Sequence, residues 1–330
     1  MSTSQDRIVG NYVIGTLLGT GGAGHVFAAR HRFLQHEVAI KIMREDRTHE
    51  PAEAQAFLAE AAGTRSIDHP NVVHVSDFGR DDLTGCCYLV MERIAGEDLA
   101  SRLRRERRLA EPTLRRLGAA IADGMQAAHD RGIVHRDLKP ANVMLAGDVP
   151  KIVDFGIAKF LGTQAAMTTS RRIGTIEYMA PEQLTGGTIA PSVDIWALGV
   201  LLFAAATGRL PFEHFEDGRC PQLFDLAPRA RTIVPALSPA LDALLARCLD
   251  KDPGRRPRTM AEVADQLRTD DASERFTEDA GPLPVATVLP TAATSARDEP
   301  APRSLLTVKT VAALTAFVAL AVGSMLAIVV

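Results

Sequence analysis

The chain has 330 residues, of which 46% are hydrophobic and 23% are charged, and its formal net charge at pH 7 is −3. This hydrophobic content is sufficient for a sizeable core. The slightly acidic balance excludes the overall basic field that a general nucleic-acid partner requires. We therefore expect a globular fold and no nucleic-acid partner.

The N-terminal sequence and the cysteines indicate a cytoplasmic location for the first part of the chain. The first ten residues, MSTSQDRIVG, contain no basic stretch followed by an apolar run, so no signal peptide is expected. The cysteines lack the paired spacing of a zinc site, and adjacent cysteines cannot easily form a disulfide. We expect reduced thiols at Cys86, Cys87, Cys220 and Cys248.

The coarse pattern predicts a strand-rich part followed by a helical part. Alternating apolar residues in 12–17 and the run His36–Met43 predict strands. The alanine-rich segment Glu53–Arg65 has one apolar face and predicts a helix. Beyond Leu99 helical periodicity dominates, which suggests a small sheet-bearing lobe before a larger helical lobe. The clearest helical runs are 114–129, 193–207 and 238–249.

Three glycines, Gly19, Gly21 and Gly24, lie between two predicted strands in the segment Leu18–Val26. Glycine lets backbone N–H groups approach phosphate oxygens without a Cβ in the way, although glycine clusters also form ordinary hairpin turns. No helix pattern follows directly, which argues against a dinucleotide-binding turn, and no Gly-Lys-Ser/Thr follows, which argues against a Walker loop. The pattern fits best a glycine-rich turn between two strands that lies over the phosphates of ATP.

A single lysine, Lys41, interrupts the apolar strand Val38–Lys41. An uncompensated ammonium group would be costly to bury, so it needs an anionic partner unless the side chain reaches out of an edge strand to solvent. Glu60, on the predicted helix that follows, is the natural partner. Together these two residues would hold a phosphate-binding lysine in place.

The segment Ile133–Leu145 gathers reactive side chains between two apolar flanks. Asp137 can accept the proton of an attacking hydroxyl, Lys139 can neutralise a phosphoryl group in transfer, and Asn142 can coordinate magnesium. Asp154 follows at the end of the next apolar run and is suited to be a second metal ligand. The order and spacing of these residues together favour phosphoryl transfer.

These motifs together resemble the eukaryotic-type protein kinase family, and most of all its bacterial serine/threonine branch. The resemblance implies an α+β, two-lobed protein kinase domain over residues 12–268, with a β-rich small lobe (12–92) that contains one main helix and a mostly helical large lobe (97–268). The matching positions are the glycine-rich loop, 38–41, Glu60, 69–71, 135–142, 154–156, 180–182, 194–196 and Arg256.

The resemblance also implies roles for individual residues. Asp137 would be the catalytic base, Lys139 its phosphate-neutralising partner, and Asn142 and Asp154 the metal ligands, while Lys41 would hold the α- and β-phosphates. The implied cofactors are ATP and Mg²⁺, with Mn²⁺ as an alternative metal. Met91 resembles the gatekeeper, 92–94 the hinge to adenine, and Asp98 a ribose contact. The implied ATP-binding residues are Leu18, Gly19, Thr20, Gly21, Gly22, Ala23, Gly24, His25, Val26, Ala39, Lys41, Glu60, Met91, Glu92, Ile94 and Asp98.

The resemblance further implies serine and threonine hydroxyls of proteins as substrates, on the basis of Lys139 and of Thr175 in the substrate loop. A phosphate in the preceding segment could pair with Arg136 and order it. The segment is alternatively a solvated loop of small polar residues. Candidate phosphorylation sites are Thr168 and Thr169, followed by Thr163 and Ser170. Autophosphorylation in trans would make a second copy of the chain a partner.

The C-terminal part changes composition twice. Residues 269–304 are rich in Pro, Ala and Thr and are predicted to be a disordered linker. Residues 305–330 are predicted to be a transmembrane helix, because Val311–Val330 is uncharged and long enough to span a bilayer. The alternative is a buried helix of the globular domain. Arg303 and Lys309 precede the apolar run, so we expect a single-pass protein of the inner membrane with its catalytic domain in the cytoplasm.

Three other functions share some of these features. A pseudokinase would keep the fold and lose the reaction, but the residues needed for phosphoryl transfer are present. A small-molecule kinase would share the two-lobed core, but the sequence Ala180-Pro181-Glu182 is typical of a peptide-accepting surface. A membrane-tethered signalling scaffold is compatible with kinase activity. The segment Glu213–Pro235 departs from the family pattern on a face where substrates dock.

Overall fold

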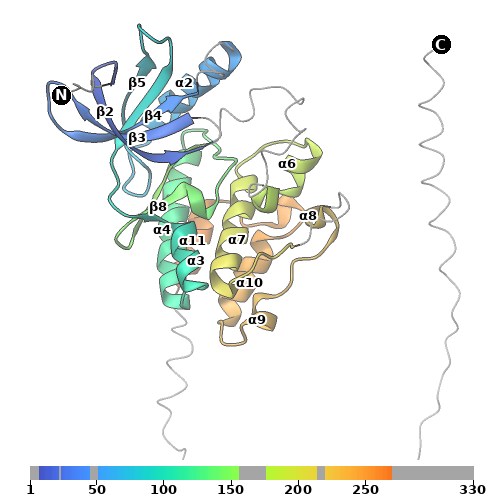
Figure 1. The fold of residues 1–330 in the computed structure, drawn as a ribbon. Helices are drawn as coiled ribbons and strands as arrows, with labels where there is room; N and C mark the ends of the chain where they lie inside the picture. The colour runs from blue at the N-terminus through green and yellow to red at the C-terminus, as the bar shows by residue number, and fades with distance from the viewer. Residues whose placement is uncertain (1–6, 22–23, 45–50, 156–175, 214–219, 270–330) are drawn as a thin grey trace, which may run out of the picture. The chain divides into compact units, whose positions relative to one another are not determined.

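The structure is a computed structural model that describes residues 7–21, 24–44, 51–155, 176–213 and 220–269. The chain divides into two compact units, Met1–Asp279 and Ala280–Val330. All of the described residues belong to the first unit, which consists of a small lobe dominated by a β-sheet and a large lobe dominated by helices (Figure 1).

The small lobe is built on a six-stranded antiparallel sheet in the order β1-β2-β3-β4-β6-β5. Helix α2 (Pro51–Arg65) packs against β5 and β6. Its alanines favour the helical conformation, and its buried Phe57 and Ala61 meet the apolar face of the sheet. The strands are β1 (Ile8–Val9), β2 (Tyr12–Thr20), β3 (Gly24–His31), β4 (Glu37–Met43), β5 (Val75–Arg80) and β6 (Cys87–Glu92).

The segment between α2 and β5 is hydrogen-bonded to the large lobe. Val73 N donates to Ile152 O at 2.9 Å, and Ile152 N donates to Asn71 O at 2.8 Å. The Asn71 side chain also donates to Pro150 O at 2.8 Å. The C-terminal end of α2 is therefore followed closely by a point at which the small lobe is fixed to the large one.

A three-stranded antiparallel sheet of β7 (Glu97–Asp98), β8 (Val143–Ala146) and β9 (Val149–Ile152) lies where the two lobes meet. At Gly96, just before β7, an added Cβ would lie 1.8 Å from Leu145 O, so only glycine permits this close approach. Asp98 then caps α3 (Leu99–Glu106) by accepting from Ser101 N at 2.7 Å.

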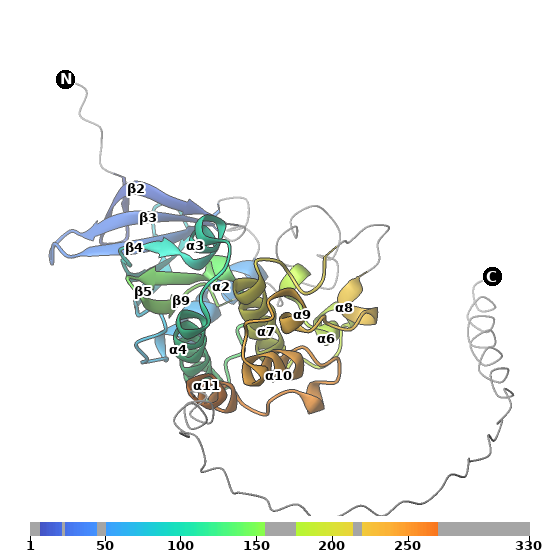
Figure 2. The same cartoon turned by 90° about the horizontal axis from the view of Figure 1, so that it is seen from below.

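Four helices form the centre of the large lobe: α4 (Glu111–His129), α7 (Ser192–Thr207), α10 (Pro239–Cys248) and α11 (Met260–Arg268). Figure 2 shows α4 and α7 side by side, with α11 against α4 and α10 against α7. Helix α7 is buried on most of its surface and apolar around its circumference, as expected of a central helix. The shorter elements are η1 (Pro140–Asn142), η3 (Ile176–Tyr178), α6 (Pro181–Thr185), α8 (Pro221–Phe224), α9 (Ala230–Ile233) and η5 (Pro253–Arg255).

The predicted two-lobed fold is confirmed, with a strand-rich small lobe and a mostly helical large lobe. The four cysteines are free thiols, as predicted. Within the described residues, no helix is long and apolar enough to cross a membrane. The predicted linker (269–304) lies almost entirely outside these residues, and the predicted transmembrane helix (305–330) lies wholly outside them.

A buried ion pair joins α6 to the segment before α11. Arg256 Nη1 and Nη2 donate to the two carboxylate oxygens of Glu182 at 2.7 and 2.9 Å. The guanidinium group also donates to three backbone carbonyl groups and lies 5.0 Å from the centre of the Trp196 ring. Because Arg256 is almost fully buried, removal of its partner would leave an uncompensated charge in the core.

We expect Glu182→Ala to lower the free energy of unfolding by about 3 kcal/mol or more, as is usual when one member of a buried pair is removed. The measurement is urea unfolding followed by the fluorescence of the single tryptophan, Trp196. The control is Glu37→Ala, which removes an exposed carboxylate paired with Arg93 at 2.6 Å and should cost less than about 1 kcal/mol. Equal costs for the two variants would contradict the structural role of Glu182.

Candidate active site

The loop after α4 is shaped by one buried carboxylate, that of Asp194 on α7. Its oxygens accept from the backbone N–H groups of His135 and Arg136, each at 2.8 Å, and from His129 Nε2 at 2.8 Å. Arg136 has φ +66°, a left-handed conformation that is unfavourable for a residue with a side chain. The Asp194 hydrogen bonds hold the backbone in this conformation. Gln183 of α6 donates to Arg136 O at 3.0 Å and supports the loop from the other side.

His135 connects this loop to the end of β9. Its Nδ1 accepts from Asp137 N at 3.2 Å, so Nε2 carries the proton and donates to Val153 O at 3.2 Å. The ring packs on Phe155 with 4.7 Å between the ring centres. One buried imidazole therefore contacts both the backbone of Asp137 and the residues on either side of Asp154.

The Asp137 carboxylate is held by two side chains from its own loop. Lys139 Nζ lies 3.3 Å from both carboxylate oxygens, and Asn142 Nδ2 donates to Oδ2 at 3.1 Å. Asn142 Nδ2 also donates to Asp137 O at 2.8 Å, which tightens the turn. Asp137 is only 6% exposed. The carboxylate is thus oriented by one cation and one amide donor.

Lys41 on β4 brings together acids from two other elements. Its Nζ lies 2.8 Å from Asp154 Oδ1 and 3.8 Å from Glu60 Oε1 on α2. Burial by itself lowers the pKa of Lys41, but the negative charges of Asp154, Glu60 and Asp137 outweigh it and raise the pKa above its usual value. Lys41 therefore stays a cation in the site, as a phosphate-binding lysine must.

The glycines of the 18–26 segment serve different purposes. At Gly24 an added Cβ would lie 2.2 Å from Ile42 O, so packing of β3 on β4 requires glycine there. An added Cβ at Gly19 would meet nothing within 4 Å, and one at Gly21 would meet only Gly24 O at 3.9 Å. Packing among the described residues therefore does not require glycine at these two positions, which is consistent with space kept for a ligand. Thr20 Oγ1 lies 3.2 Å from His25 Nδ1 across the hairpin.

The predicted adenine-side residues occupy the strands behind this loop. Ala39 and Met91 are paired across β4 and β6 and are both buried. Val26 and Ile94 pack at the edge of the same apolar cluster. Leu18 is 49% exposed. Apolar side chains thus line the inner side of the small lobe where an aromatic base would lie.

Two predicted nucleotide contacts have side chains engaged elsewhere. The Glu92 carboxylate accepts from Lys151 Nζ at 2.7 Å and from His74 N at 2.8 Å, so it braces β6 against β9. The Asp98 carboxylate accepts from Ser101 N and Ser101 Oγ at the start of α3. Both side chains have structural roles in this conformation, and the roles predicted for them in nucleotide binding stay predictions.

The structure brings most of the predicted catalytic and metal-binding side chains into one site between the lobes. Several predicted residues lie outside the described part of the chain, namely Gly22, Ala23, Thr163, Thr168, Thr169, Ser170 and Thr175. The predicted residue roles as a whole stay predictions.

Sequence reasoning assigned no role to three residues that position the loop: Asp194, His129 and Gln183. Asp194 left a signal, since it is the single charged residue in the otherwise apolar helix Ser192–Thr207. A charge in such a helix needs buried donors. Gln183 and His129 have no distinctive sequence context, and only the fold shows their contacts.

The donors fit a magnesium ion bound together with a nucleotide. Asn142 is fixed through Nδ2, so its side-chain oxygen, Oδ1, can face a ligand, and the Asp154 carboxylate is 39% exposed. Among the described residues, no group of three or more His, Cys, Asp and Glu side chains could hold a metal ion alone. Two protein oxygens with further ligands from phosphates and water are the usual arrangement for Mg²⁺.

Known proteins with similar sequences support the same class of site. The family model described as protein kinase domain matches residues 12–267. The chain therefore belongs to the protein kinase family, which confirms the resemblance seen in the sequence.

The chain is 35% identical over 276 residues to the serine/threonine-protein kinase PknA of Mycobacterium tuberculosis, covering 81% of this chain and 62% of PknA. It is 34% identical over 283 residues to the serine/threonine-protein kinase pkn3 of Myxococcus xanthus, covering 80% of this chain and 50% of pkn3. The crystal structure of the M. tuberculosis PknI kinase domain shares the fold, with a TM-score of 0.65 at 24% identity, covering 81% of this chain and 98% of that domain. The chain thus spans less than two thirds of the length of PknA and of pkn3.

We expect Asp194→Asn to loosen the catalytic loop, because the amide nitrogen would replace one oxygen that accepts a backbone N–H group. Loss of a hydrogen bond to a charged group costs about 1.5–3 kcal/mol. Amide hydrogen exchange at His135 and Arg136 should therefore accelerate by about 10- to 100-fold. The matched control is Asp123→Asn on α4, whose carboxylate pairs with Arg268 at the surface. Unchanged protection of residues 135–137 in Asp194→Asn would contradict the role given to Asp194.

Proposed function

We propose that the chain is a serine/threonine protein kinase that transfers the γ-phosphoryl group of ATP to serine and threonine hydroxyls of proteins. The observation that carries this proposal is that short contacts join the oriented Asp137 carboxylate to Lys41. Asn142 holds Asp137 and accepts at its backbone oxygen from Val153 N at 2.9 Å, and the next residue, Asp154, lies 2.8 Å from Lys41 Nζ. A proton acceptor and a phosphate-binding cation therefore share one site. The choice of serine and threonine as acceptors is supported by the relatives PknA and pkn3, which are both described as serine/threonine-protein kinases.

In this mechanism the acceptor hydroxyl gives its proton to Asp137 as its oxygen forms a bond to the γ-phosphorus. The bond between that phosphorus and the bridging oxygen breaks, and ADP leaves with the electron pair. Lys139 lies beside Asp137 and compensates negative charge on the transferring group, while Lys41 holds the α- and β-phosphates. Asn142 and Asp154 would hold Mg²⁺, which neutralises phosphate charge when bound.

We expect Asp137→Asn to reduce the phosphorylation rate of a protein substrate by about 10²- to 10⁴-fold, the usual contribution of a general base. ATP affinity should change little, because Asp137 is assigned to the hydroxyl rather than to the nucleotide. The measurement is transfer of labelled phosphate by the full chain in detergent, together with ATP binding.

The control for this experiment is Asp82→Asn, which makes the same change on an exposed loop of the small lobe and should leave the rate unchanged. A wild-type chain that binds ATP with Mg²⁺ or Mn²⁺ but transfers no phosphate would instead indicate a nucleotide-binding pseudokinase or scaffold.

Activation by autophosphorylation belongs to the same proposal. Thr168 and Thr169, followed by Thr163 and Ser170, are the acceptors whose phosphate would pair with Arg136 and order the segment before Thr175. The sequence supplies the acceptors, and the backbone of Arg136 is held firmly by Asp194 and Gln183. Mass-spectrometric mapping of the same reaction should find this phosphate in the wild type and not in Asp137→Asn. A second copy of the chain would be the enzyme for transfer in trans.

Membrane anchoring by residues 305–330 is a further part of the proposal. The uncharged run Val311–Val330 has the length of a bilayer-spanning helix. Arg303 and Lys309 before it favour a cytoplasmic catalytic domain at the inner membrane.

We expect the full chain to stay in the membrane pellet after an alkaline carbonate wash of bacterial membranes. A chain that ends at Arg303 should be recovered in the supernatant, because it lacks the apolar run. Recovery of both chains in the same fraction would contradict the anchor. Phosphoryl transfer by the shorter chain serves as the control that its catalytic domain is folded.

A further inference from the structure

A groove of about 320 Å³ opens in the large lobe beside the candidate active site. Lys139 of the catalytic loop forms part of its lining, and Lys139 Nζ lies 3.3 Å from the Asp137 carboxylate. The groove therefore shares one residue, Lys139, with the site where an acceptor hydroxyl would react. Much of its remaining lining is small or apolar, including Ala100, Ala141, Ala204 and Leu210.

Three arginines with exposed side chains line this groove: Arg104 in α3, Arg107 directly after α3, and Arg209 after α7. Arg104 Nη2 donates to Ser101 Oγ at 2.7 Å. Among the residues that the structure describes, none of these three arginines forms an ion pair with a carboxylate, and no Asp or Glu lines the groove. The nearest acid to Arg104 in these contacts is Asp98, which accepts from the same Ser101 hydroxyl at 3.0 Å but does not line the groove. The lining of the groove therefore carries an excess of positive charge.

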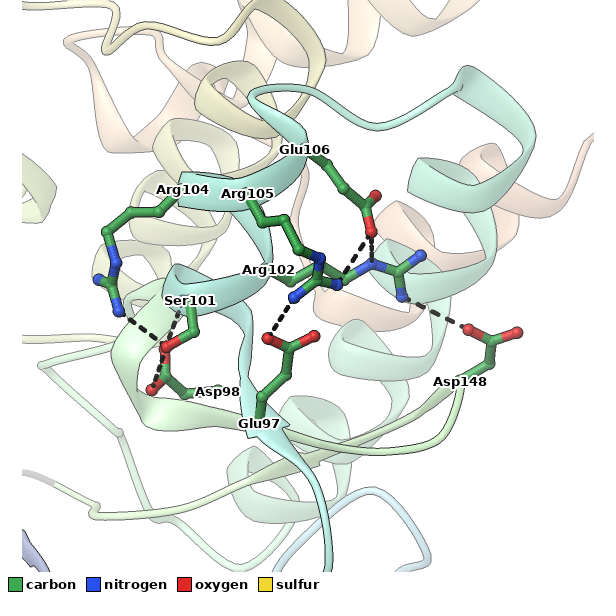
Figure 3. A network of polar contacts seen from close by, with 8 residues as sticks. All are labelled: Glu97, Asp98, Ser101, Arg102, Arg104, Arg105, Glu106 and Asp148. Carbon is green, nitrogen blue, oxygen red and sulfur yellow. Dashed lines mark hydrogen bonds and ion pairs between the residues drawn. The ribbon is translucent and has the colours of Figure 1, made fainter.

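Two other arginines of α3 are neutralised instead. Figure 3 shows the guanidinium groups of Arg102 and Arg105 facing carboxylates. The nitrogen–oxygen distances are 2.6 to 3.4 Å. Arg104 projects away from this network, toward Ser101 (Figure 3). The acids in the network are Glu97, Glu106 and Asp148. Helix α3 therefore has one neutralised face and one positively charged face, and the positively charged face lines the groove.

Helix ends account for only part of this arrangement. Arg107 is the C-cap of α3, and Arg209 follows Gly208, the C-cap of α7. A cation near a helix C-terminus contributes about 0.3–1 kcal/mol through the helix dipole. A single cation at each helix end would supply this dipole contribution. It does not explain why three guanidinium groups line the same groove, with small side chains between them. Their summed potential attracts an anionic group, and guanidinium groups bind carboxylates in bidentate geometry.

We infer that this groove selects protein substrates with acidic side chains close to the acceptor serine or threonine. The inference rests on the proposed kinase function and names the substrate class of the same site. An extended peptide advances roughly 3.3 Å per residue. Because Lys139 belongs to both the groove and the active site, a carboxylate about two to four residues from the acceptor would reach the arginines.

The test compares peptides that contain one threonine among alanines and differ only at the residues two and three positions away. These two residues are both Asp, both Asn or both Lys, placed before the threonine in one set and after it in the other. The measured quantity is kcat/KM for the full chain in detergent. In at least one set, we expect the Asp peptide to exceed the Asn peptide about tenfold and the Lys peptide to be the poorest. High salt should reduce this difference, because it screens exposed charges.

Charge reversal separates recognition from a purely structural role of the arginines. In Arg104→Glu, combined with Arg107→Glu, the order should invert so that the Lys peptide exceeds the Asp peptide. The rate with the Asn peptide should stay within about twofold of the wild-type rate. The matched control is Arg105→Glu, on the neutralised face of the same helix, which should keep the wild-type order.

Equal kcat/KM values for Asp and Asn peptides in both sets would overturn the inference and leave the kinase function standing. Failure of the wild type to phosphorylate any peptide would count against the kinase function instead. In that case the inference is tested by the binding of the same peptides, measured by fluorescence anisotropy. Binding of the Asp peptide that is lost in the double Glu variant supports it, and equal binding of Asp and Lys peptides overturns it.

Discussion

The candidate active site depends on the burial of one carboxylate, that of Asp194. Removing a charge from water is costly unless donors replace the lost hydration. Here two backbone N–H groups and the His129 side chain replace it. In return, the carboxylate stabilises the left-handed conformation of Arg136, from which the chain turns toward Asp137. The central helix of the large lobe and the geometry of the reactive loop are therefore fixed by the same contact.

The other half of the site is assembled around a cation rather than an anion. Lys41 comes from the small lobe, Glu60 from α2, and Asp154 from the end of β9 in the large lobe. Because Lys41 and Glu60 carry opposite charges, burial of both is tolerated, while the Asp154 carboxylate stays 39% exposed. The phosphate-binding position thus exists only when these elements lie together, whereas the Asp137 loop is complete within the large lobe.

The sequence predicted the two lobes and the reactive residues because both leave local signals. Strand alternation and helical periodicity show the lobes, and the order of charged residues around Asp137 shows the chemistry. Contacts between distant segments leave little local signal. The sequence therefore could not show that Glu92 pairs with Lys151, or that Asp98 caps α3. It also could not separate Gly24, which strand packing requires, from its neighbours that face open space.

The hydrogen bonds that fix residues 71–73 to β9 have a mechanical consequence for α2. This helix ends at Arg65, close to that fixed point, so any rotation of the helix would be centred near its C-terminal end. At 1.5 Å rise per residue, Glu60 is about 7.5 Å from Arg65 and Pro51 is about 21 Å away. A swing of α2 would therefore displace Glu60 by about a third of the movement of Pro51, a reduction that helps to keep its carboxylate within reach of Lys41.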